Sequence, residues 1–276
     1  MTSAPGGSAV TADPADLLVL AEKTALEAGD LVRDRREAVE RMAVAGTKST
    51  PTDVVTESDT AAEALIRSRL FAARPDDGFL GEEDGSVAGT TGVDWVVDPI
   101  DGTVNYLYGL PQYAVSIAAQ IDGVVRAGVV HNPASGETWT AVLGGGAWLD
   151  GRPVRVSACS SLSLALVGTG FGYDAERRAR QAAVLLEVVP AVRDIRRAGA
   201  AALDLCAVAS GRLDAYYERG LNPWDLAAGG LIAAEAGAVV GGLRGAPAGN
   251  DMTLAATPGV ADELTALLER LGADRD

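Results

Sequence analysis

Two aspartates stand three residues apart in the run Asp98-Pro-Ile-Asp101-Gly-Thr103, directly after a short apolar segment. If that segment is a buried strand, both carboxylates lie at its C-terminal end, where they suit a hard cation with oxygen ligands. Gly102 and Thr103 open a segment that can start a helix, and the exposed N–H groups of a helix start suit a phosphate. The alternative is a surface turn in which Asp98 caps a helix. The run therefore indicates either a cation site beside a phosphate or a plain helix cap.

Two further acidic clusters favour the cation site. Glu82 and Glu83 follow the short apolar segment 78–80, so they could lie on the same sheet edge as Asp98. Asp225 begins an apolar helix with almost no polar face, where it is either an ordinary N-terminal cap or a buried carboxylate. A buried carboxylate needs a cation or strong hydrogen bonds. Three acidic clusters without a basic cluster are explained more economically by one metal site than by three separate caps.

Other hydrolytic chemistries find little support in the sequence. His131 is the only histidine, and its place at the end of an expected strand favours a structural role over a serine–histidine hydrolase or a zinc site. The sequence contains no GxSxG motif and no Walker loop. The glycines 144–146 lie between expected strands, which is typical of a tight turn and not of a phosphate-binding loop.

The formal net charge of −15 limits the partners that this chain can bind. Nucleic acids and anionic membranes attract surfaces rich in Lys and Arg, so we expect neither as a partner. A small phosphorylated substrate remains compatible with this charge if a bound cation reverses the local field. An acidic enzyme that acts on an anion would need such a cation.

The elements that must position these residues are predicted from the apolar pattern, which indicates a layered α/β fold with two halves. Helical spacing from Asp16 to Val32 predicts a long amphipathic helix, and period-2 segments around Asp122-Gly123 predict a β-hairpin. Further helices are expected from residue 58 or 59 to before 75, and at 175–189, 224–236 and 260–271. Strands are expected at 78–80, 95–97, 113–121, 124–130, 138–142, 147–149, 164–168 and 252–256, with another strand, helix and strand leading to 217.

The chain shows no internal repeat, linker or low-complexity tract, and its 276 residues are 48% hydrophobic. We therefore predict one domain over residues 13–276, with halves of about 13–157 and 158–276 and a flexible tail at 1–12. Cys159 and Cys206 match no CxxC spacing, so we expect free thiols in a reducing, cytoplasmic compartment. No signal peptide is expected, and the most apolar stretch, 226–243, falls short of a membrane span.

These motifs, at this spacing, resemble the inositol monophosphatase family, which is part of the lithium-sensitive, magnesium-dependent phosphatase superfamily. The likeness runs from about Ala15 to Leu268. It rests on the segment 48–59, the pair Glu82-Glu83, the run 98–103 and Trp224-Asp225-Leu-Ala-Ala-Gly229. The segments 201–206 and 214–218 also resemble the substrate side of the inositol monophosphatase branch.

The resemblance implies a layered αβαβα sandwich like that of fructose-1,6-bisphosphatase and inositol monophosphatase, a Mg²⁺ cofactor and a homodimer. The implied reaction is hydrolysis of myo-inositol monophosphate, a small phosphorylated polyol, to inositol and phosphate by a metal-activated water. The first magnesium position would use Glu82, Asp98 and the carbonyl of Ile100. The second would use Asp98, Asp101 and Asp225, and a third, weaker ion would also use Glu82.

The resemblance also implies roles for residues around the metal. Gly102 and Thr103 would donate backbone N–H groups to the phosphate, and Thr103 with Asp59 would position the attacking water. The catalytic set is thus Asp59, Thr103 and Glu82. The substrate contacts would come from Asp101, Gly102, Thr103, the backbone around Ala201, Glu218 and Asp225. One departure is Ala200, where the family often has a small hydroxyl residue.

Two groups of alternatives remain. A sister phosphatase of the same fold could act on histidinol phosphate, fructose 1,6-bisphosphate or a 3′-phosphonucleotide, although Tyr216-Tyr217-Glu218 favours inositol. From another class, the chain could be a catalytically idle member that serves as a binding or regulatory subunit.

Overall fold

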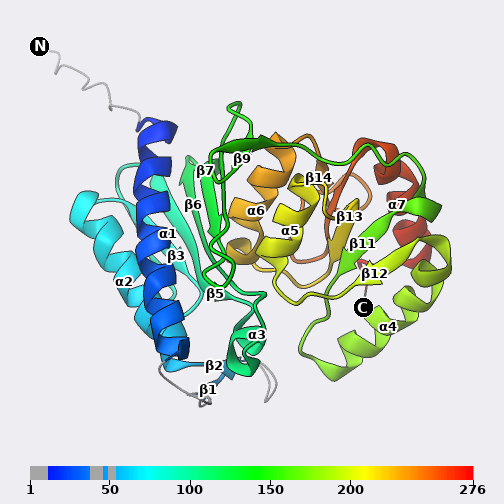
Figure 1. The fold of residues 1–276 in the computed structure, drawn as a ribbon, viewed down its shortest axis with the longest axis horizontal. Coiled ribbons are helices and arrows are strands. Elements are labelled where there is room, and N and C mark those ends of the chain that lie inside the picture. The colour runs from blue at the N-terminus through cyan, green and yellow to red at the C-terminus, as the bar shows by residue number, and fades with distance from the viewer. Residues whose placement is uncertain (1–11, 38–45, 49–53, 276) are drawn as a thin grey trace, which may run out of the picture.

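The computed structural model describes residues 12–37, 46–48 and 54–275 (Figure 1). The predicted tail at 1–12, except Ala12, lies outside the described residues. So does Ser49 to Asp53, the middle of the segment 48–59 that contributes to the family resemblance.

Helices α1 (Pro14–Glu37) and α2 (Glu57–Ala73) form the first layer. The apolar positions of α1 repeat at helical spacing, and Leu17, Ala21 and Val32 are all buried against the first sheet and α2. Helix α2 begins with a capping box, in which Thr56 and Asp59 satisfy each other's backbone N–H groups. Its start is therefore fixed by local hydrogen bonds as well as by packing.

The first sheet has eight strands in the order β10-β9-β8-β7-β6-β5-β3-β4. Only the β3/β5 pair is parallel, and the predicted hairpin of β6 and β7 is present. The strands are β3 (Gly78–Gly81), β4 (Ser86–Val87), β5 (Val93–Asp101), β6 (Ala114–Ile121), β7 (Val124–His131), β8 (Thr138–Val142), β9 (Ala147–Leu149) and β10 (Arg152–Val154). A separate two-stranded sheet pairs β1 (Gly46–Thr47) with β2 (Val54–Val55).

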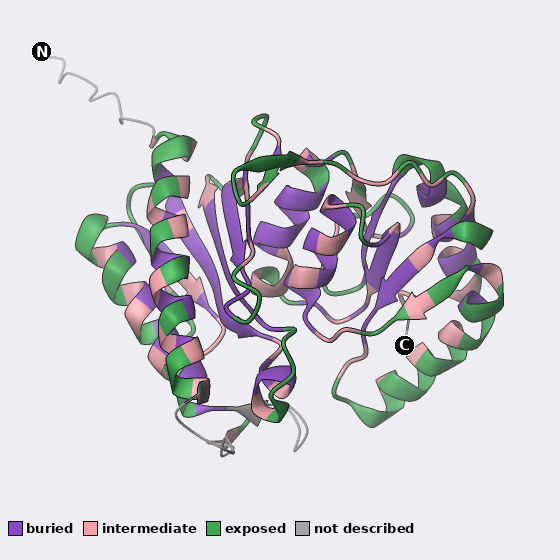
Figure 2. Ribbon diagram, in the orientation of Figure 1, coloured by how far each residue is buried: buried purple, intermediate pink, exposed green. Residues whose placement is uncertain are grey.

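Helices α5 (Ala201–Ala209) and α6 (Pro223–Glu235) lie between the two sheets (Figure 1). Figure 2 shows that they are mostly buried, in agreement with their nearly all-apolar sequences. The second sheet has the order β12-β11-β13-β15-β14. Its strands are β11 (Leu166–Thr169), β12 (Asp194–Arg196), β13 (Ala215–Glu218), β14 (Val239–Gly241) and β15 (Thr253–Ala256).

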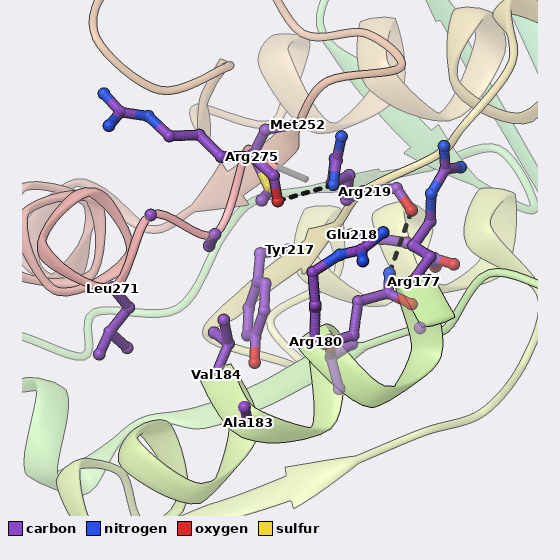
Figure 3. Close-up of a pocket in the computed structure, with 15 residues that line it drawn as sticks. Arg177, Arg180, Ala183, Val184, Tyr217, Glu218, Arg219, Met252, Leu271 and Arg275 are labelled. Atoms are coloured by element: carbon purple, nitrogen blue, oxygen red, sulfur yellow. Dashed lines mark hydrogen bonds between the residues drawn. The ribbon is translucent and has the colours of Figure 1, made fainter. Parts of the chain in front are cut away.

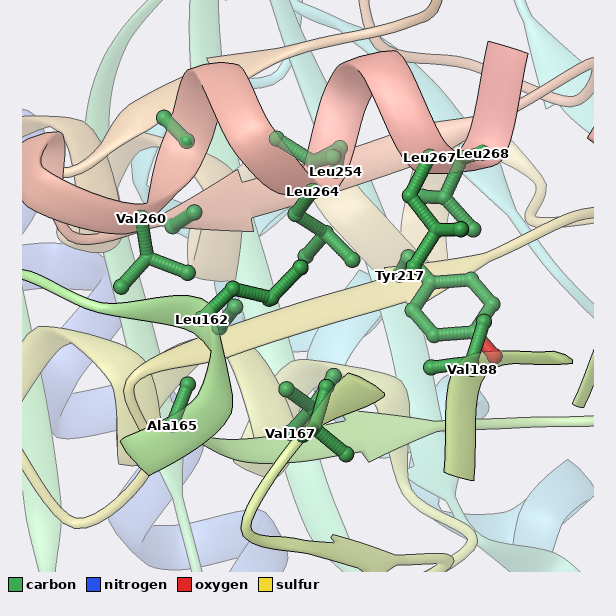
Figure 4. Packing of buried hydrophobic residues seen from close by; sticks show 14 of the residues in the cluster. Leu162, Ala165, Val167, Val188, Tyr217, Leu254, Val260, Leu264, Leu267 and Leu268 are labelled. Atoms are coloured by element: carbon green, nitrogen blue, oxygen red, sulfur yellow. The ribbon is translucent and has the colours of Figure 1, made fainter. Parts of the chain in front are cut away.

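Helices α4 (Ala175–Val188) and α7 (Pro258–Leu271) cover the outer face of the second sheet. Figure 4 shows Val260, Leu264 and Leu268 of α7 packed over Val167 and Tyr217 of this sheet. The short elements α3 (Thr103–Tyr108), Leu162–Leu164 and Val189–Ala191 complete the described fold. The order helix, sheet, helix, sheet, helix confirms the predicted αβαβα sandwich.

The differences from the sequence prediction are confined to small elements. The strands β1, β2, β4, β10 and β14, which the apolar pattern missed, are two or three residues long. Strands this short contain too few alternations for a period-2 pattern to stand out. Cys159 and Cys206 are free thiols, as predicted. Among the described helices, none combines the length and hydropathy that crossing a membrane requires.

The central helix layer should be the most sensitive to loss of side-chain volume. Leu205 on α5 is fully buried, whereas Leu186 on α4 is 75% exposed. We expect Leu205→Ala to lower the free energy of unfolding by about 2–5 kcal/mol, because it leaves a cavity. The same change at Leu186 should cost less than about 0.5 kcal/mol. Urea unfolding of both variants checks this, and equal losses would contradict the layer assignment.

Candidate active site

A β-bulge brings Asp98 and Asp101 to the same side of strand β5. Side chains alternate along a regular strand, so residues three apart would face opposite sides. In the structure Asp98 lies opposite Ser116 and Asp101 opposite Ala114, which places one extra residue in β5. Pro99 lies within this irregularity, where a missing backbone donor does little harm. Both carboxylates are buried, with exposed fractions of 1% and 7%.

Asp225 joins them from the other half of the chain. It lies in the first turn of α6, where its Oδ2 accepts the N–H of Asn222 over 2.7 Å in a capping box. One carboxylate oxygen from each of Asp98, Asp101 and Asp225 lies within 4.8 Å of the others. The sequence left open whether Asp225 is a helix cap or a buried member of an acidic site. The structure shows both roles, because this half-buried residue caps its helix and completes the acidic cluster.

Glu82 lies on the same edge, as expected from the parallel pairing of β3 with β5. The turn that carries it is held by Glu63, a fully buried residue of α2. The carboxylate of Glu63 accepts the N–H of Glu83 over 2.9 Å and that of Asp84 over 2.7 Å. Glu82 and Asp98 line the same cavity.

The cluster is electrostatically crowded. Burial, followed by the neighbouring carboxylates, raises the pKa of Asp98 and of Asp101 well above the usual range. Burial also raises the pKa of Asp225 to about 7. Such carboxyl groups either take up protons and become neutral or stay charged beside a cation. Oxygen ligands, high negative charge and close approach are the requirements of a hard divalent cation, so these residues fit Mg²⁺.

Lys48 supplies a positive charge beside the cluster. Its Nζ lies 2.8 Å from Oε1 of Glu82 and 2.7 Å from Oε1 of Glu83. Burial lowers the pKa of Lys48, but Glu82 and Glu83 raise it by more, so the ammonium group stays charged. Burial is also the main cause that raises the pKa of Glu83 to about 7.

Asp59 and Thr103 form a pair behind the cluster. The hydroxyl oxygen of Thr103 lies 3.0 Å from Oδ1 of Asp59 and 3.0 Å from the carbonyl oxygen of Ile100. Asp59 is fully buried, and its other oxygen accepts the N–H and the hydroxyl of Thr56. Gly102 precedes Thr103 with φ of 89°, where a Cβ would approach the carbonyl oxygen of Gln112 to 2.7 Å, so this position requires glycine.

Asp101 also connects the two halves. The N–H groups of Ala201 and Ala202 donate to its carboxylate over 3.2 Å and 2.7 Å. Ala200, the residue before α5, has no side chain that could cap this helix, and Asp101 takes that role. The predicted substrate contact at Ala201 therefore already has an acceptor inside the protein for its N–H group.

These residues surround a cavity of about 620 Å³ between the two halves. At its far end Glu218, the last residue of β13, accepts the hydroxyl of Tyr216, and burial raises the pKa of Glu218. All predicted site residues line this cavity except Asp59, which contacts it through Thr103. The lining includes Glu82, Asp98, Ile100, Asp101, Gly102, Thr103, Ala201, Glu218 and Asp225.

Sequence reasoning assigned no role to Lys48, Glu63 or Arg177, which support or line this site. Lys48 had a signal, because it is one of two lysines in the chain and lies within one of the quoted motifs. Glu63 had none, because nothing in a helical pattern shows that a carboxylate will hold a turn twenty residues later. Arg177 on α4 lines the cavity from the second half.

Comparison with known proteins agrees with this geometry. Residues 13–275 match the inositol monophosphatase family. The chain is 51% identical to the inositol-1-monophosphatase SuhB of Mycobacterium tuberculosis strain H37Rv over 94% of this chain and 95% of that protein. The solved structure of Mycobacterium tuberculosis SuhB superposes with a TM-score of 0.81 at 49% identity, over 94% of this chain and 98% of that one.

The chain belongs to the inositol monophosphatase family. The predicted family is thus confirmed. A more distant family relative carries a different name: the Nus factor SuhB of Escherichia coli strain K12 is 39% identical over 83% of this chain and 86% of its own length.

Removing one charge from the crowded cluster should stabilise the metal-free protein. In Asp98→Asn the amide oxygen can still accept the N–H of Ile100, which Asp98 accepts over 3.0 Å. At pH 8 in EDTA we expect a gain of about 1 kcal/mol or more in unfolding free energy, since one pKa unit corresponds to about 1.4 kcal/mol. Urea unfolding measures it, with the exposed Asp76→Asn as the matched control.

The sign of the pH dependence follows from the raised pKa of Asp98. The folded wild-type protein binds this proton more tightly than the unfolded chain, so the wild type regains stability as the pH falls. The advantage of Asp98→Asn should therefore shrink toward pH 5. An advantage that stayed constant with pH, or that Asp76→Asn shared, would contradict charge crowding.

Proposed function

We propose that this chain, a phosphatase of the inositol monophosphatase family, hydrolyses myo-inositol monophosphate to inositol and phosphate with Mg²⁺. The observation that carries the proposal is the convergence of Asp98, Asp101 and Asp225 on one wall of a 620 Å³ cavity. A cavity of this size suits a small ligand. A negative cluster in its wall would repel a phosphate unless cations bind there.

In this proposal Glu82, Asp98 and the carbonyl of Ile100 would hold one Mg²⁺, and Asp98, Asp101 and Asp225 would hold a second. A third, weaker ion would again use Glu82. Bound Mg²⁺ would offset phosphate charge and lower the pKa of a bound water. The ammonium group of Lys48 offsets part of the negative charge of Glu82 and Glu83 when fewer cations are bound.

The protein's own groups would orient the attacking water. Thr103 can give its hydroxyl hydrogen to Asp59 or to the carbonyl of Ile100, because both acceptors lie at 3.0 Å. Its oxygen then keeps a lone pair for a proton of the water. Asp59 would act as a positioning residue, holding that hydroxyl in one rotamer from behind. The backbone N–H groups of Gly102 and Thr103 would receive the phosphate.

Glu218 is proposed to recognise the polyol. Its Oε2 accepts the hydroxyl of Tyr216, and the carboxylate keeps further acceptor capacity toward the cavity that it lines. A ring polyol offers several hydroxyl donors to such an acceptor. Lithium sensitivity, a homodimer and a cytoplasmic location are further parts of the proposal, taken from the family resemblance and the composition.

A second candidate function follows from the relative named Nus factor SuhB, because that name does not describe a phosphatase. In that case the chain would serve as a binding subunit. The presence of every proposed metal ligand in one cavity favours the enzyme.

A substrate panel tests the proposed reaction. Purified protein is assayed for phosphate release from inositol monophosphate, histidinol phosphate, fructose 1,6-bisphosphate and a 3′-phosphonucleotide, with and without Mg²⁺. We expect the highest kcat/KM for inositol monophosphate and almost no turnover in EDTA. Preference for another compound would refute the substrate, and no turnover of any compound would favour the binding subunit.

Glu218→Gln should separate substrate recognition from chemistry. The variant keeps an acceptor for Tyr216 but loses the charge that strengthens a hydrogen bond to a substrate hydroxyl. We expect kcat/KM for inositol monophosphate to fall about ten- to a hundredfold, equivalent to roughly 1.5–3 kcal/mol. p-Nitrophenyl phosphate has no hydroxyl to lose, so its kcat/KM should change little. Equal losses on both substrates would remove the polyol role from Glu218.

A further inference from the structure

The proposed substrate contacts in the 620 Å³ cavity come from two separate parts of the chain. The phosphate turn, Gly102 and Thr103, belongs to the first half, whereas Ala201 and Glu218 belong to the second. Glu218, at the end of β13, also lines a neighbouring cavity together with Arg177 of α4 (Figure 3). The polyol side is therefore built from second-half elements, and a substrate that contacts both sides needs them at a fixed distance.

Asn105 of α3 makes a contact that crosses between the two halves. This residue is 5% exposed, and its Nδ2 donates to the carbonyl oxygen of Gln112 over 2.7 Å and to that of Ala198 over 2.8 Å. Both amide hydrogens are used, one within the first half and one for a residue 93 positions later. Buried polar groups of this kind are costly to leave unpaired, so the two carbonyl groups have defined places around the amide.

The phosphate turn is packed against the same two segments. A Cβ on Gly102 would approach the carbonyl oxygen of Gln112 to 2.7 Å and that of Gly199 to 3.2 Å. Gly199 has φ of 89°, and a Cβ there would lie 3.2 Å from Nδ2 of Asn105. The turn, residue 112 and residues 198–199 thus meet around one amide group, with little space that could absorb a shift.

The two sides of the cavity depend on Asn105 to different degrees. The hydroxyl of Thr103 has its hydrogen-bond acceptors inside the first half. The segment 198–202 is joined to the first half by Asp101, which accepts two of its N–H groups, and by Asn105. Asp101 is itself a proposed Mg²⁺ ligand, whereas the amide of Asn105 is neutral. Loss of this amide should therefore shift the second-half segment and leave the phosphate turn in place.

We propose that Asn105 is a positioning residue, which sets the distance between the phosphate turn and the segment 198–201 so that a polyol phosphate can contact both at once. This role rests on the proposed function for its substrate class, because only a substrate that reaches both sides depends on their distance. An amide suits the role, since it donates two hydrogen bonds in fixed directions and adds no charge to the acidic cluster.

Asn105→Ala tests the role with two substrates in the presence of Mg²⁺. For inositol monophosphate we expect kcat/KM to fall about ten- to a hundredfold, mainly through a higher KM, because a small displacement of one wall weakens the polyol contacts. For p-nitrophenyl phosphate, which has no polyol to place, the loss should be at least about fivefold smaller. Equal losses on both substrates, or no loss on either, would overturn the positioning role.

Asn132→Ala is the matched control. Asn132 is 6% exposed, and its Nδ2 donates to the carbonyl oxygen of Pro111 over 3.1 Å. It therefore holds the residue next to Gln112 without reaching the second half. We expect the ratio of the two kcat/KM values to stay as in the wild type. A selective loss equal to that of Asn105→Ala would assign the effect to the loop at 111–112 and overturn the proposal.

Gly199→Ala disturbs the same contact from the other side, which matters if the loss of two buried hydrogen bonds keeps Asn105→Ala from folding. The new Cβ would be directed at Nδ2 of Asn105 and would also meet Nη1 of Arg197 at 2.4 Å. This variant should show the same selective loss for inositol monophosphate. A wild-type ratio of the two kcat/KM values in Gly199→Ala would contradict the proposal.

Amide hydrogen exchange of the full chain in EDTA needs neither metal nor turnover. The N–H groups of Ala201 and Ala202 donate to Asp101, so their protection reports whether the segment stays in place. In Asn105→Ala we expect both to exchange about tenfold or more faster, with unchanged rates in α7. Equal acceleration in α7, or unchanged rates at Ala201 and Ala202, would overturn the proposal. A wild-type preference for another phosphate ester would refute the proposed reaction and leave this measurement valid.

Discussion

Like-charged carboxylates buried against one another are the constraint on which this structure depends. Asp98 and Asp101 come from the first sheet and Asp225 from a helix of the second half, yet their oxygens converge within 4.8 Å. Burial raises the pKa of all three carboxyl groups, and repulsion by neighbouring carboxylates raises it further, so keeping them charged in this site costs free energy. The fold must hold them together by other interactions until a cation neutralises them.

Backbone N–H groups do most of that work. Two N–H groups of α5 bind Asp101, and one N–H group before α6 binds Asp225. Both helices are packed between the sheets by apolar contacts, so hydrophobic burial fixes the positions of the donors. The free energy of burying the apolar core therefore offsets the electrostatic cost of bringing these carboxylates together.

The sequence allowed prediction of the features that are local. The strand ending at Asp98, the helix beginning near Asp225 and the shared edge of Glu82 all follow from apolar patterns, and the structure has them. The bulge at Pro99 was not predicted. The alternation of apolar and polar residues is read along one strand, and it does not show where the neighbouring strand lacks a matching residue. Glu63 was missed for a similar reason, since its role depends on where a distant turn folds.

The basic side chains are also unevenly distributed in this acidic protein. An acidic protein that handles an anion has to separate the surface that binds cations from the surface that attracts the anion. Here the carboxylates of the metal cluster line one part of the 620 Å³ cavity, and Arg177, Arg197 and Arg219 line the same cavity from the second half of the chain. Arg177, Glu218 and Arg219 line both this cavity and a neighbouring one of about 520 Å³. A charge change at any of these three residues would therefore act on both cavities, whereas a change at Arg180, which lines only the neighbouring one, would act mainly on that one.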